Sequence, residues 1–365
     1  MPARHKSVEI QLASKLEVGV ESLIMGLSTL CLTLGEFLMK KTLIALAAVA
    51  AVGAASAQVT LYGKMDLGVY ASSGSVGGVA SVDQFKAGEN NISNSRWGMK
   101  GSEDLGGGMT ASFTLESKIT AGTGATGTNL FDRNSQLNLS GGFGTISMGR
   151  MYTAYDNALG YTDAQGYHNM AAINILAGGA HGDAGRTNNS IAYTTPAMKG
   201  FQVQVHTAPG ADATTAATAS GYNSLWMSYM SGPLGLHYAY ESTVAAGGAQ
   251  TVSNAVGANY NAGIATISLL AETGSNAANA QDSGYNLSVA VPMGSYSVNA
   301  GYAREATSNL TASNGTRSAY SVTGVYPLSK RSNIYAAYYS SSSTVDSTTV
   351  ETKSSKFALG MRHDF

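Results

Sequence analysis

The sequence predicts an all-β protein, a transmembrane antiparallel β-barrel of 16 strands. Three observations predict this fold class. Charged residues are only 12% of the 365 residues, whereas they make up about a quarter of soluble globular chains. Apolar and polar side chains alternate with period two through most of the chain after residue 58. The connecting segments are alternately short and long, which is typical of an outer-membrane barrel.

The N-terminal part of the chain is not predicted to belong to the barrel. Residues 39–57 contain a positively charged start (MKK), an apolar stretch and an Ala-Ser-Ala cleavage motif, which together indicate a secretory signal peptide. The apolar stretch is shorter than the ~20 residues of a membrane-spanning helix. We interpret residues 1–38 as the product of an upstream translation start and residues 58–365 as the barrel domain.

The alternating runs define the predicted strands. In the first run, Leu61, Met65 and Leu67 share one face, and Lys64 and Asp66 share the other. With ends placed to about ±2–4 residues, the runs lie at 59–71, 94–105, 108–121, 129–140, 143–151, 187–195, 200–208, 221–231, 234–243, 252–262, 264–274, 282–291, 294–306, 315–327, 330–342 and 353–365.

The connectors between these runs fall into two classes. Short ones, rich in turn residues, lie at 104–107, 140–144, 196–200, 231–235, 291–294 and 327–330. Longer ones lie at 72–93, 122–128, 152–186, 209–220, 244–251, 275–281, 307–314 and 343–352. A sheet in lipid must leave no backbone edge unpaired, so we expect it to close, with its apolar face toward hydrocarbon and its polar face lining a lumen.

Composition and motifs argue against several other functions. A net charge of -1 lacks the basic footprint of a nucleic-acid-binding protein. The single cysteine, Cys31, lies in the predicted discarded part. The histidines are scattered, and neither a nucleophile elbow nor an HExxH pair occurs. We therefore expect no catalytic site, no metal site and no cofactor.

Six motifs carry a resemblance to a known family. They are VTLYG at 59–63, SRWGMKGSEDLGGG at 95–108, GTISMGR at 144–150, RTNNS at 186–190, LSKR at 328–331 and GMRHDF at 360–365. In this order they resemble the trimeric general porins of Gram-negative outer membranes, of the beta-proteobacterial type. The resemblance implies a homotrimer in outer-membrane lipid that forms a water-filled channel for passive diffusion of small hydrophilic solutes and ions.

The resemblance also bears on the chain's end and on its third long connector. The terminal Phe365 resembles the signal that such proteins present to the barrel-assembly machinery, or else it is an interfacial aromatic that ends the chain. The 152–186 connector is unusually long, and in the family the third loop folds into the lumen. This loop lacks the family's Pro-Glu-Phe-Gly-Gly segment. Its carboxylates are Asp156, Asp163 and Asp183.

Basic side chains are expected to face the loop across a constriction. The resemblance places Arg96, Arg133 and Arg186 at the narrowest part of the pore, and Arg150 lies where the fifth strand enters the loop. By strand parity Lys64, Lys100, Asp66 and Glu116 face inward. Opposed charges create a transverse field, and clustered arginines favour anions, so we expect a weak anion preference. Alternatively, each arginine pairs with a strand carboxylate and does not affect permeation.

Two other functions remain open at this stage. An outer-membrane barrel also serves as an adhesin or surface receptor, for which the 72–93 and 209–220 connectors are candidates. A barrel enzyme is the less favoured alternative, because it requires a compact cluster of catalytic side chains. The channel is the function that the patterns favour most.

Overall fold

The structure is a computed structural model that describes residues 59–127, 129–176, 185–210, 221–244, 249–276, 280–308, 314–346 and 350–365. The predicted signal peptide and the segment before it lie outside the described residues. In the described part of the chain, the strands form one sheet of nineteen. Sixteen long strands make the barrel, and three short pieces, β2, β3 and β6, are added to it.

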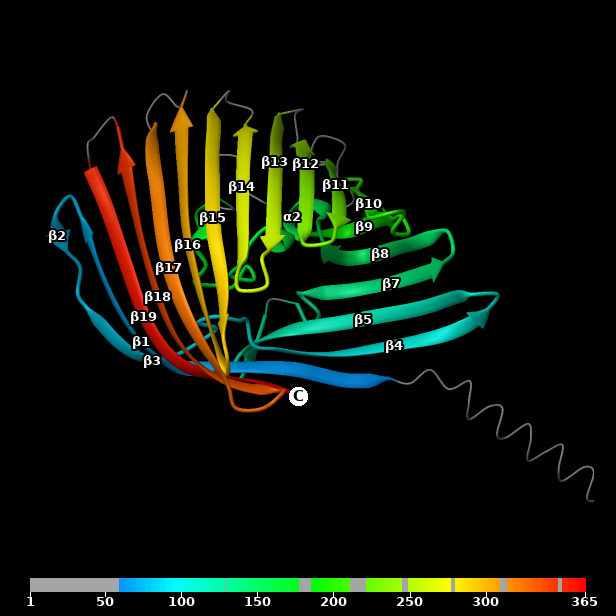
Figure 1. Ribbon diagram of the computed structural model, residues 1–365, viewed down its shortest axis with the longest axis horizontal. Helices are drawn as coiled ribbons and strands as arrows, with labels where there is room; N and C mark the ends of the chain where they lie inside the picture. The colour runs from blue at the N-terminus through cyan, green and yellow to red at the C-terminus, as the bar shows by residue number, and fades with distance from the viewer. Residues whose placement is uncertain are drawn as a thin grey trace, which may run out of the picture. The chain divides into compact units, whose positions relative to one another are not determined.

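The elements follow one another along the chain as a meander (Figure 1). The first half contains β1 (Thr60–Val76), β2 (Val79–Ala80), β3 (Gln84–Glu89), β4 (Arg96–Gly106), β5 (Met109–Thr120), β6 (Ala125–Thr126), β7 (Asn134–Gly141), β8 (Gly144–Tyr152), α2 (Ala154–Tyr161), the 3-10 helix η1 (Ala172–Ile175), β9 (Arg186–Thr194) and β10 (Phe201–Ala208). The second half contains β11 (Gly221–Ser231), β12 (Leu234–Val244), β13 (Gln250–Asn261), β14 (Thr266–Ser275), β15 (Gln281–Met293), β16 (Tyr296–Ser308), β17 (Gly315–Pro327), β18 (Ser332–Val345) and β19 (Val350–Asp364).

The first and last strands close the sheet. Strand β1 pairs with β19 in antiparallel register from Lys64↔Asp364 to Val76↔Thr352. Two backbone hydrogen bonds between Gly63 and Phe365, of 3.0 and 3.1 Å, extend this pairing to the last residue. Each long strand of the described chain therefore has a partner on both sides. This result confirms the predicted antiparallel barrel of sixteen strands.

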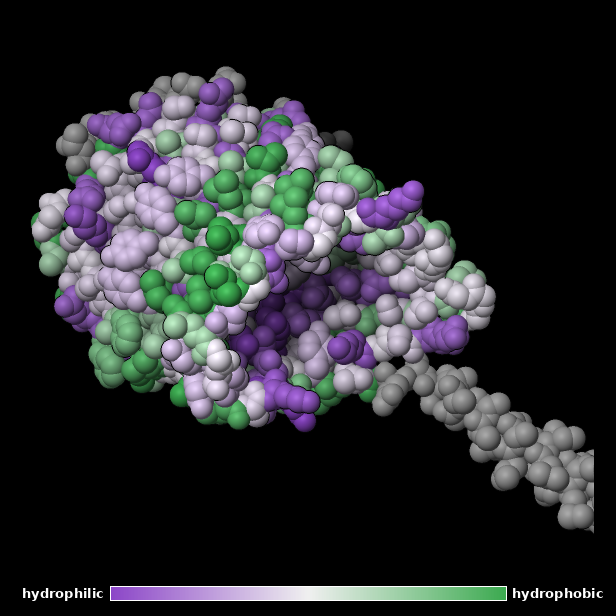
Figure 2. Space-filling view, in the orientation of Figure 1, coloured by the Kyte–Doolittle hydropathy of each residue, from purple (hydrophilic) through white to green (hydrophobic). Residues whose placement is uncertain are grey.

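Side chains on the two faces of the barrel wall differ as the alternation predicts. Large apolar side chains stand exposed on the outer face, at positions such as Leu137, Val256, Leu269, Leu287 and Leu359. Their neighbours on the inner face are small or polar, and hydrophilic residues gather in the hollowed part of the molecule (Figure 2). An outer face on which so many large apolar side chains are exposed is favourable when its surroundings are hydrocarbon.

The second barrel strand departs from the prediction. The 72–93 connector was expected to be a loop, but β1 continues to Val76, and β3 returns along it with Leu67 opposite Glu89. Farther down, Lys64 lies opposite Arg96 of β4. Residues 90–95 interrupt the strand between β3 and β4. Polar residues in this segment break the alternation of apolar and polar side chains, so the sequence pattern did not reveal β3, the strand that precedes it.

Two short helices lie in the connector between β8 and β9. Helix α2 packs against β10, β11 and β12, and η1 packs against β15, β16 and β17 (Figure 1). Thr153 caps α2, because its Oγ1 accepts a hydrogen bond of 3.0 Å from the Asp156 N–H. Among the described residues, no helix has both the length and the apolar character needed to cross a membrane.

Adjacent residues on β7 allow a direct test of the two faces. Leu137 is 53% exposed on the outer face, and Gln136 lies on the inner face. We expect Leu137→Arg to lower the free energy of unfolding in lipid vesicles by about 2–4 kcal/mol, because the arginine is placed in hydrocarbon. Gln136→Arg should have a much smaller effect, since its side chain reaches water. Equal losses in urea titrations of the two variants would contradict this assignment of faces.

Candidate constriction site

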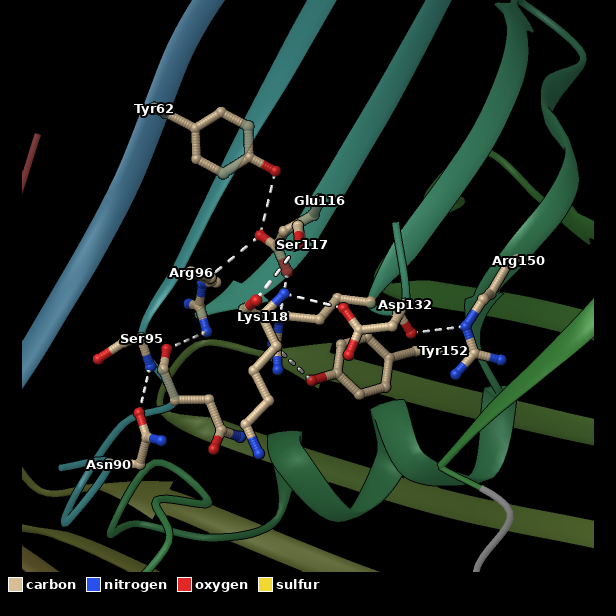
Figure 3. A network of polar contacts seen from close by, with 12 residues as sticks. Tyr62, Asn90, Ser95, Arg96, Glu116, Ser117, Lys118, Asp132, Arg150 and Tyr152 are labelled. Carbon is tan, nitrogen blue, oxygen red and sulfur yellow. Dashed lines mark hydrogen bonds and ion pairs between the residues drawn. The ribbon is translucent and has the colours of Figure 1, made fainter. Parts of the chain in front are cut away.

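A carboxylate on β5 organises the basic side chains of the first strands. Glu116 accepts a hydrogen bond of 2.6 Å from Arg133 Nε and one of 3.0 Å from the Tyr62 hydroxyl. Arg96 Nε lies 3.4 Å from the same carboxylate. Figure 3 shows Glu116 between Tyr62 and Arg96. One negative charge thus holds two guanidinium groups, so their combined charge is only partly compensated.

Two further arginines lie beside this group. The Arg186 guanidinium stacks on the Tyr152 ring at 3.6 Å from its centroid, and the Tyr152 hydroxyl accepts a hydrogen bond of 3.4 Å from Arg133. Arg150 Nε donates a hydrogen bond of 2.6 Å to the carbonyl of Asp132. Its Nη1 donates to Asn188 Oδ1 at 2.7 Å. The arginines at the two ends of the 152–186 connector are therefore held in place, Arg186 by the Tyr152 ring and Arg150 by a backbone carbonyl and a side-chain amide.

Asp66 has a structural position. It is fully buried, and its Oδ2 accepts hydrogen bonds from the backbone N–H groups of Ile92 at 2.9 Å and Ser93 at 2.7 Å. Its other oxygen accepts a hydrogen bond from the Tyr335 hydroxyl. These bonds fix the segment that interrupts the second strand. The sequence-based interpretation of Asp66 as an inward-facing charge misses this role.

The segment 153–176 packs on the inner-face side chains of distant strands. Its buried apolar residues Tyr155, Leu159, Ile173 and Leu176 form one cluster with small wall residues, among them Ala239, Ala255, Ala303 and Ala319. Wall glycines allow close approach. A Cβ at Gly257, Gly284 or Gly301 would clash with Thr162, Leu176 or Gln165, respectively. The wall is therefore shaped to receive this segment.

Polar contacts attach the same segment to strands around the ring. Ala154 N donates to Ser224 Oγ of β11 at 3.1 Å, and Ala164 N donates to Ser288 Oγ of β15 at 2.9 Å. The Tyr155 hydroxyl donates to Glu272 of β14 at 3.1 Å. Gln165 Oε1 accepts a hydrogen bond of 2.9 Å from Ser321 of β17. Within the segment, Asp163 accepts a hydrogen bond of 2.9 Å from the Tyr167 N–H.

A cavity of about 480 Å³ lies between the segment and the first strands. Its basic lining comes from Lys64, Arg96, Arg133 and Arg362, and its carboxylate is Asp156. The remaining lining residues are Ser93, Asn94, Tyr152, Asn157, Gly160, Tyr161, Gly166, Tyr167 and Asn169. Asp156 is buried and accepts a hydrogen bond of 3.3 Å from the Tyr167 hydroxyl. The cavity therefore has basic groups on the barrel wall and one carboxylate on the segment.

The cavity brings together part of the predicted set. Glu116 is not a lining residue, but it forms ion pairs with the lining residues Arg96 and Arg133. Arg150 and Arg186 also lie outside the lining. Three other predicted residues are also outside it: Asp66, Asp163 and Lys100, whose ammonium lies 5.3 Å from the Tyr62 ring centroid. Asp183 lies outside the described residues.

Sequence reasoning missed two contributors to the cavity. Arg362 alternates with the outward residues Leu359 and Met361 on β19, so strand parity was a signal that could have found it. Among the described residues, Arg362 makes no ion pair, and its Nε has no hydrogen-bond partner. Tyr161 ends α2, and no pattern in the connector predicted that helix.

The fold and this site define a class of protein, the outer-membrane channel. Comparison with known proteins gives the family. The family model described as "Gram-negative porin" matches residues 42–346, and the chain belongs to this family. It forms an outer-membrane channel for passive diffusion.

Individual relatives agree with this assignment. The chain is 39% identical over 255 residues to outer membrane porin protein 32 of Delftia acidovorans, covering 64% of this chain and 70% of the relative. It is 29% identical to an outer membrane porin protein of Bordetella pertussis, covering 90% of this chain and all of the relative. Its structure is similar to that of an anion-selective porin from Comamonas acidovorans, with a TM-score of 0.72, 26% identity, and coverage of 85% and 100%.

His168 provides a test of the segment's packing. Burial lowers the pKa of this imidazole to about 4. Its Nδ1 accepts a hydrogen bond of 3.1 Å from the Met170 N–H, which requires an unprotonated nitrogen. The lowered pKa means that the neutral ring stabilises the fold above pH 6.5. This stability is lost as the pH falls from about 6.5 toward 4, where the unfolded chain alone binds the proton.

We therefore expect the His168 resonance to stay unshifted between pH 7.5 and 5.5 in NMR spectra of the protein in detergent micelles. A His168→Asn variant assigns the signal. Titration of His168 near 6.5 would show that the segment does not bury the ring.

Proposed function

We propose that the segment 153–176 lies inside the barrel and narrows the channel, and that the cavity beside it is an anion-preferring constriction. Support comes from the segment's contacts with strands as far apart as β10, β14 and β17. A short segment can contact such distant strands of a closed ring if it lies inside the ring. The segment occupies space that solutes would otherwise use.

The lining charges support the anion preference. Four basic side chains and one carboxylate line the cavity. Glu116 offsets part of the charge of two arginines, and Asp364 forms an ion pair of 3.6 Å with Lys64. The remaining excess is positive in a cavity enclosed between the segment and the barrel wall, where anions are favoured. The Comamonas acidovorans porin, 26% identical, is described as anion-selective, which is consistent with this proposal.

Assembly and export are proposed on the basis of sequence. We propose a homotrimer in outer-membrane lipid, because the motifs resemble those of trimeric porins. Phe365, whose backbone pairs with Gly63, serves in this proposal as the signal to the barrel-assembly machinery. Residues 39–57 serve as a signal peptide that is removed after export, and residues 1–38 come from an upstream translation start.

The alternatives to a channel have no specific observation in their favour. Within the described residues, no group of three or more His, Cys, Asp or Glu side chains is placed to hold a metal ion. The relatives are porins rather than enzymes. We therefore propose a passive channel without catalysis or cofactor, and we do not assign a receptor role to its outer loops.

Glycine substitutions test the position of the segment. Gly257→Ala should push Thr162 away from the wall, with overpacking strain of about 1–3 kcal/mol. We expect a larger or noisier single-channel conductance in planar bilayers, because the packing of the segment against β13 is weakened. Gly324→Ala is the matched control, since its added Cβ meets nothing within 4 Å. Identical conductance for both variants and the unmodified protein would argue against a narrowing segment.

Charge substitutions test the selectivity. In a potassium chloride gradient, the unmodified channel should give a reversal potential of the sign that chloride preference requires. Arg362→Gln and Arg133→Ala should both shift this potential toward the potassium value, because each removes positive charge from the cavity lining. Arg304→Gln, on the outer face of β16, should leave it unchanged. An unchanged potential in Arg362→Gln would remove that residue from the selectivity site.

A further inference from the structure

Tyr161 is an exposed aromatic residue in a segment most of whose residues are buried. Its side chain is 57% exposed, although it ends a helix whose residues Tyr155 and Leu159 are fully buried. One face of its ring stacks on Trp226 of β11, with centroids 4.8 Å apart and planes 9° from parallel. Tyr161 is also one of the residues that line the cavity.

The wall fixes the orientation of this ring. Trp226 is buried, and its Nε1 donates a hydrogen bond of 3.4 Å to His237 Nδ1. His237 lies nearly parallel to both rings, at 6.1 Å from each centroid. The Tyr161 carbonyl accepts a hydrogen bond of 3.5 Å from Asn259. Tyr161 is thus a preorganised flat surface, which reduces the entropy lost when a ligand stacks on it.

There is open space beside the ring. The cavity lining next to Tyr161 includes Gly160 and Gly166, which have no side chains. A Cβ at Gly166 would have no atom within 4 Å. The cavity volume of about 480 Å³ lies within the range of about 300–1,000 Å³ that is usual for small-molecule sites. This volume is sufficient for a single-ring compound.

The charges determine how an anion would lie in this space. The C-terminal end of α2, at Tyr161, carries a partial negative charge and disfavours an anionic group. The opposite wall presents Arg96, Arg362 and Lys64. An anion that also carries a ring would place its charge at the wall and its ring at Tyr161. An aliphatic anion uses only the first of these two contacts.

We propose that this cavity is a transient binding site for small aromatic carboxylates on their way through the channel. The carboxylate binds to Arg96 and Arg362, and the ring stacks on the exposed face of Tyr161. The inference rests on the proposed anion-preferring constriction and names a class of solute for it. Binding at such a site must be weak enough to permit release, so the effect is a higher flux at low solute concentration rather than tight retention.

Benzoate and cyclohexanecarboxylate are suitable probes, because they share the charge and approximate size but only benzoate is flat. The purified protein is recorded in planar bilayers in potassium chloride, and each probe is titrated while chloride current is measured. We expect half-maximal reduction of the current at a concentration of benzoate about two- to tenfold below that of cyclohexanecarboxylate, the factor that aromatic stacking contributes.

Variants of Tyr161 locate the effect. Tyr161→Leu should bring the concentration ratio of the two probes to about one, whereas Tyr161→Phe, which keeps the ring, should retain the ratio. Tyr338→Leu, on the outer face of β18, is the matched control and should behave like the unmodified protein. The readout is a ratio within each variant, so a change in overall conductance does not affect it.

Three results would overturn the inference. Equal effects of the two probes on the unmodified channel would show that the ring contributes nothing. An undiminished preference for benzoate in Tyr161→Leu would place the aromatic contact elsewhere. In both of these cases, a preference of the channel for chloride over potassium would still support the proposed constriction. A channel that prefers potassium to chloride would overturn the proposed constriction and this inference together.

Discussion

The closed backbone pairing of the wall is the constraint on which the rest of the structure depends. Hydrocarbon offers no hydrogen bonds, and an unpaired backbone group there costs several kcal/mol. The pairing of β1 with β19, continued by Gly63 and Phe365, removes the last free edge of the described sheet. Once the ring is closed, successive side chains must alternate between lipid and the interior. The outward leucines and inward alanines follow from this geometry.

Closure also explains how the site is built. Because most of the outer face belongs to lipid, the buried charged groups gather on the inner face, where they are close to one another. Glu116 binds two arginines there, and Asp66 binds the backbone of the segment that interrupts the second strand. The segment 153–176 fits the wall where alanines and glycines leave space for it. The cavity is the space that remains between this segment and the basic side chains.

The sequence predicted the features that depend on periodicity. Strand number, antiparallel order and the inward direction of Lys64 and Glu116 follow from alternation, which is a local property. It did not predict β3, because the six mostly polar residues 90–95 interrupt the pairing beside Asp66. Strand parity could have placed Arg362 on the inner face, but only the three-dimensional structure shows that it lines the same cavity as Arg96 and Arg133. The place of Tyr161 in the cavity lining was not predicted, because it depends on a helix that is held by tertiary contacts.

Successive side chains of each barrel strand face hydrocarbon and the water-filled interior in turn. The sequence has one cysteine, Cys31, in the predicted leader, so single cysteines introduced along β7 report on single positions. In lipid vesicles, labels at the outer positions Leu137 and Leu139 should be quenched by brominated lipid, and labels at Gln136 and Asn138 by a water-soluble quencher. We expect the two quenchers to alternate with period two along the strand. Uniform quenching by the water-soluble reagent would contradict the assignment of alternate side chains to lipid and water.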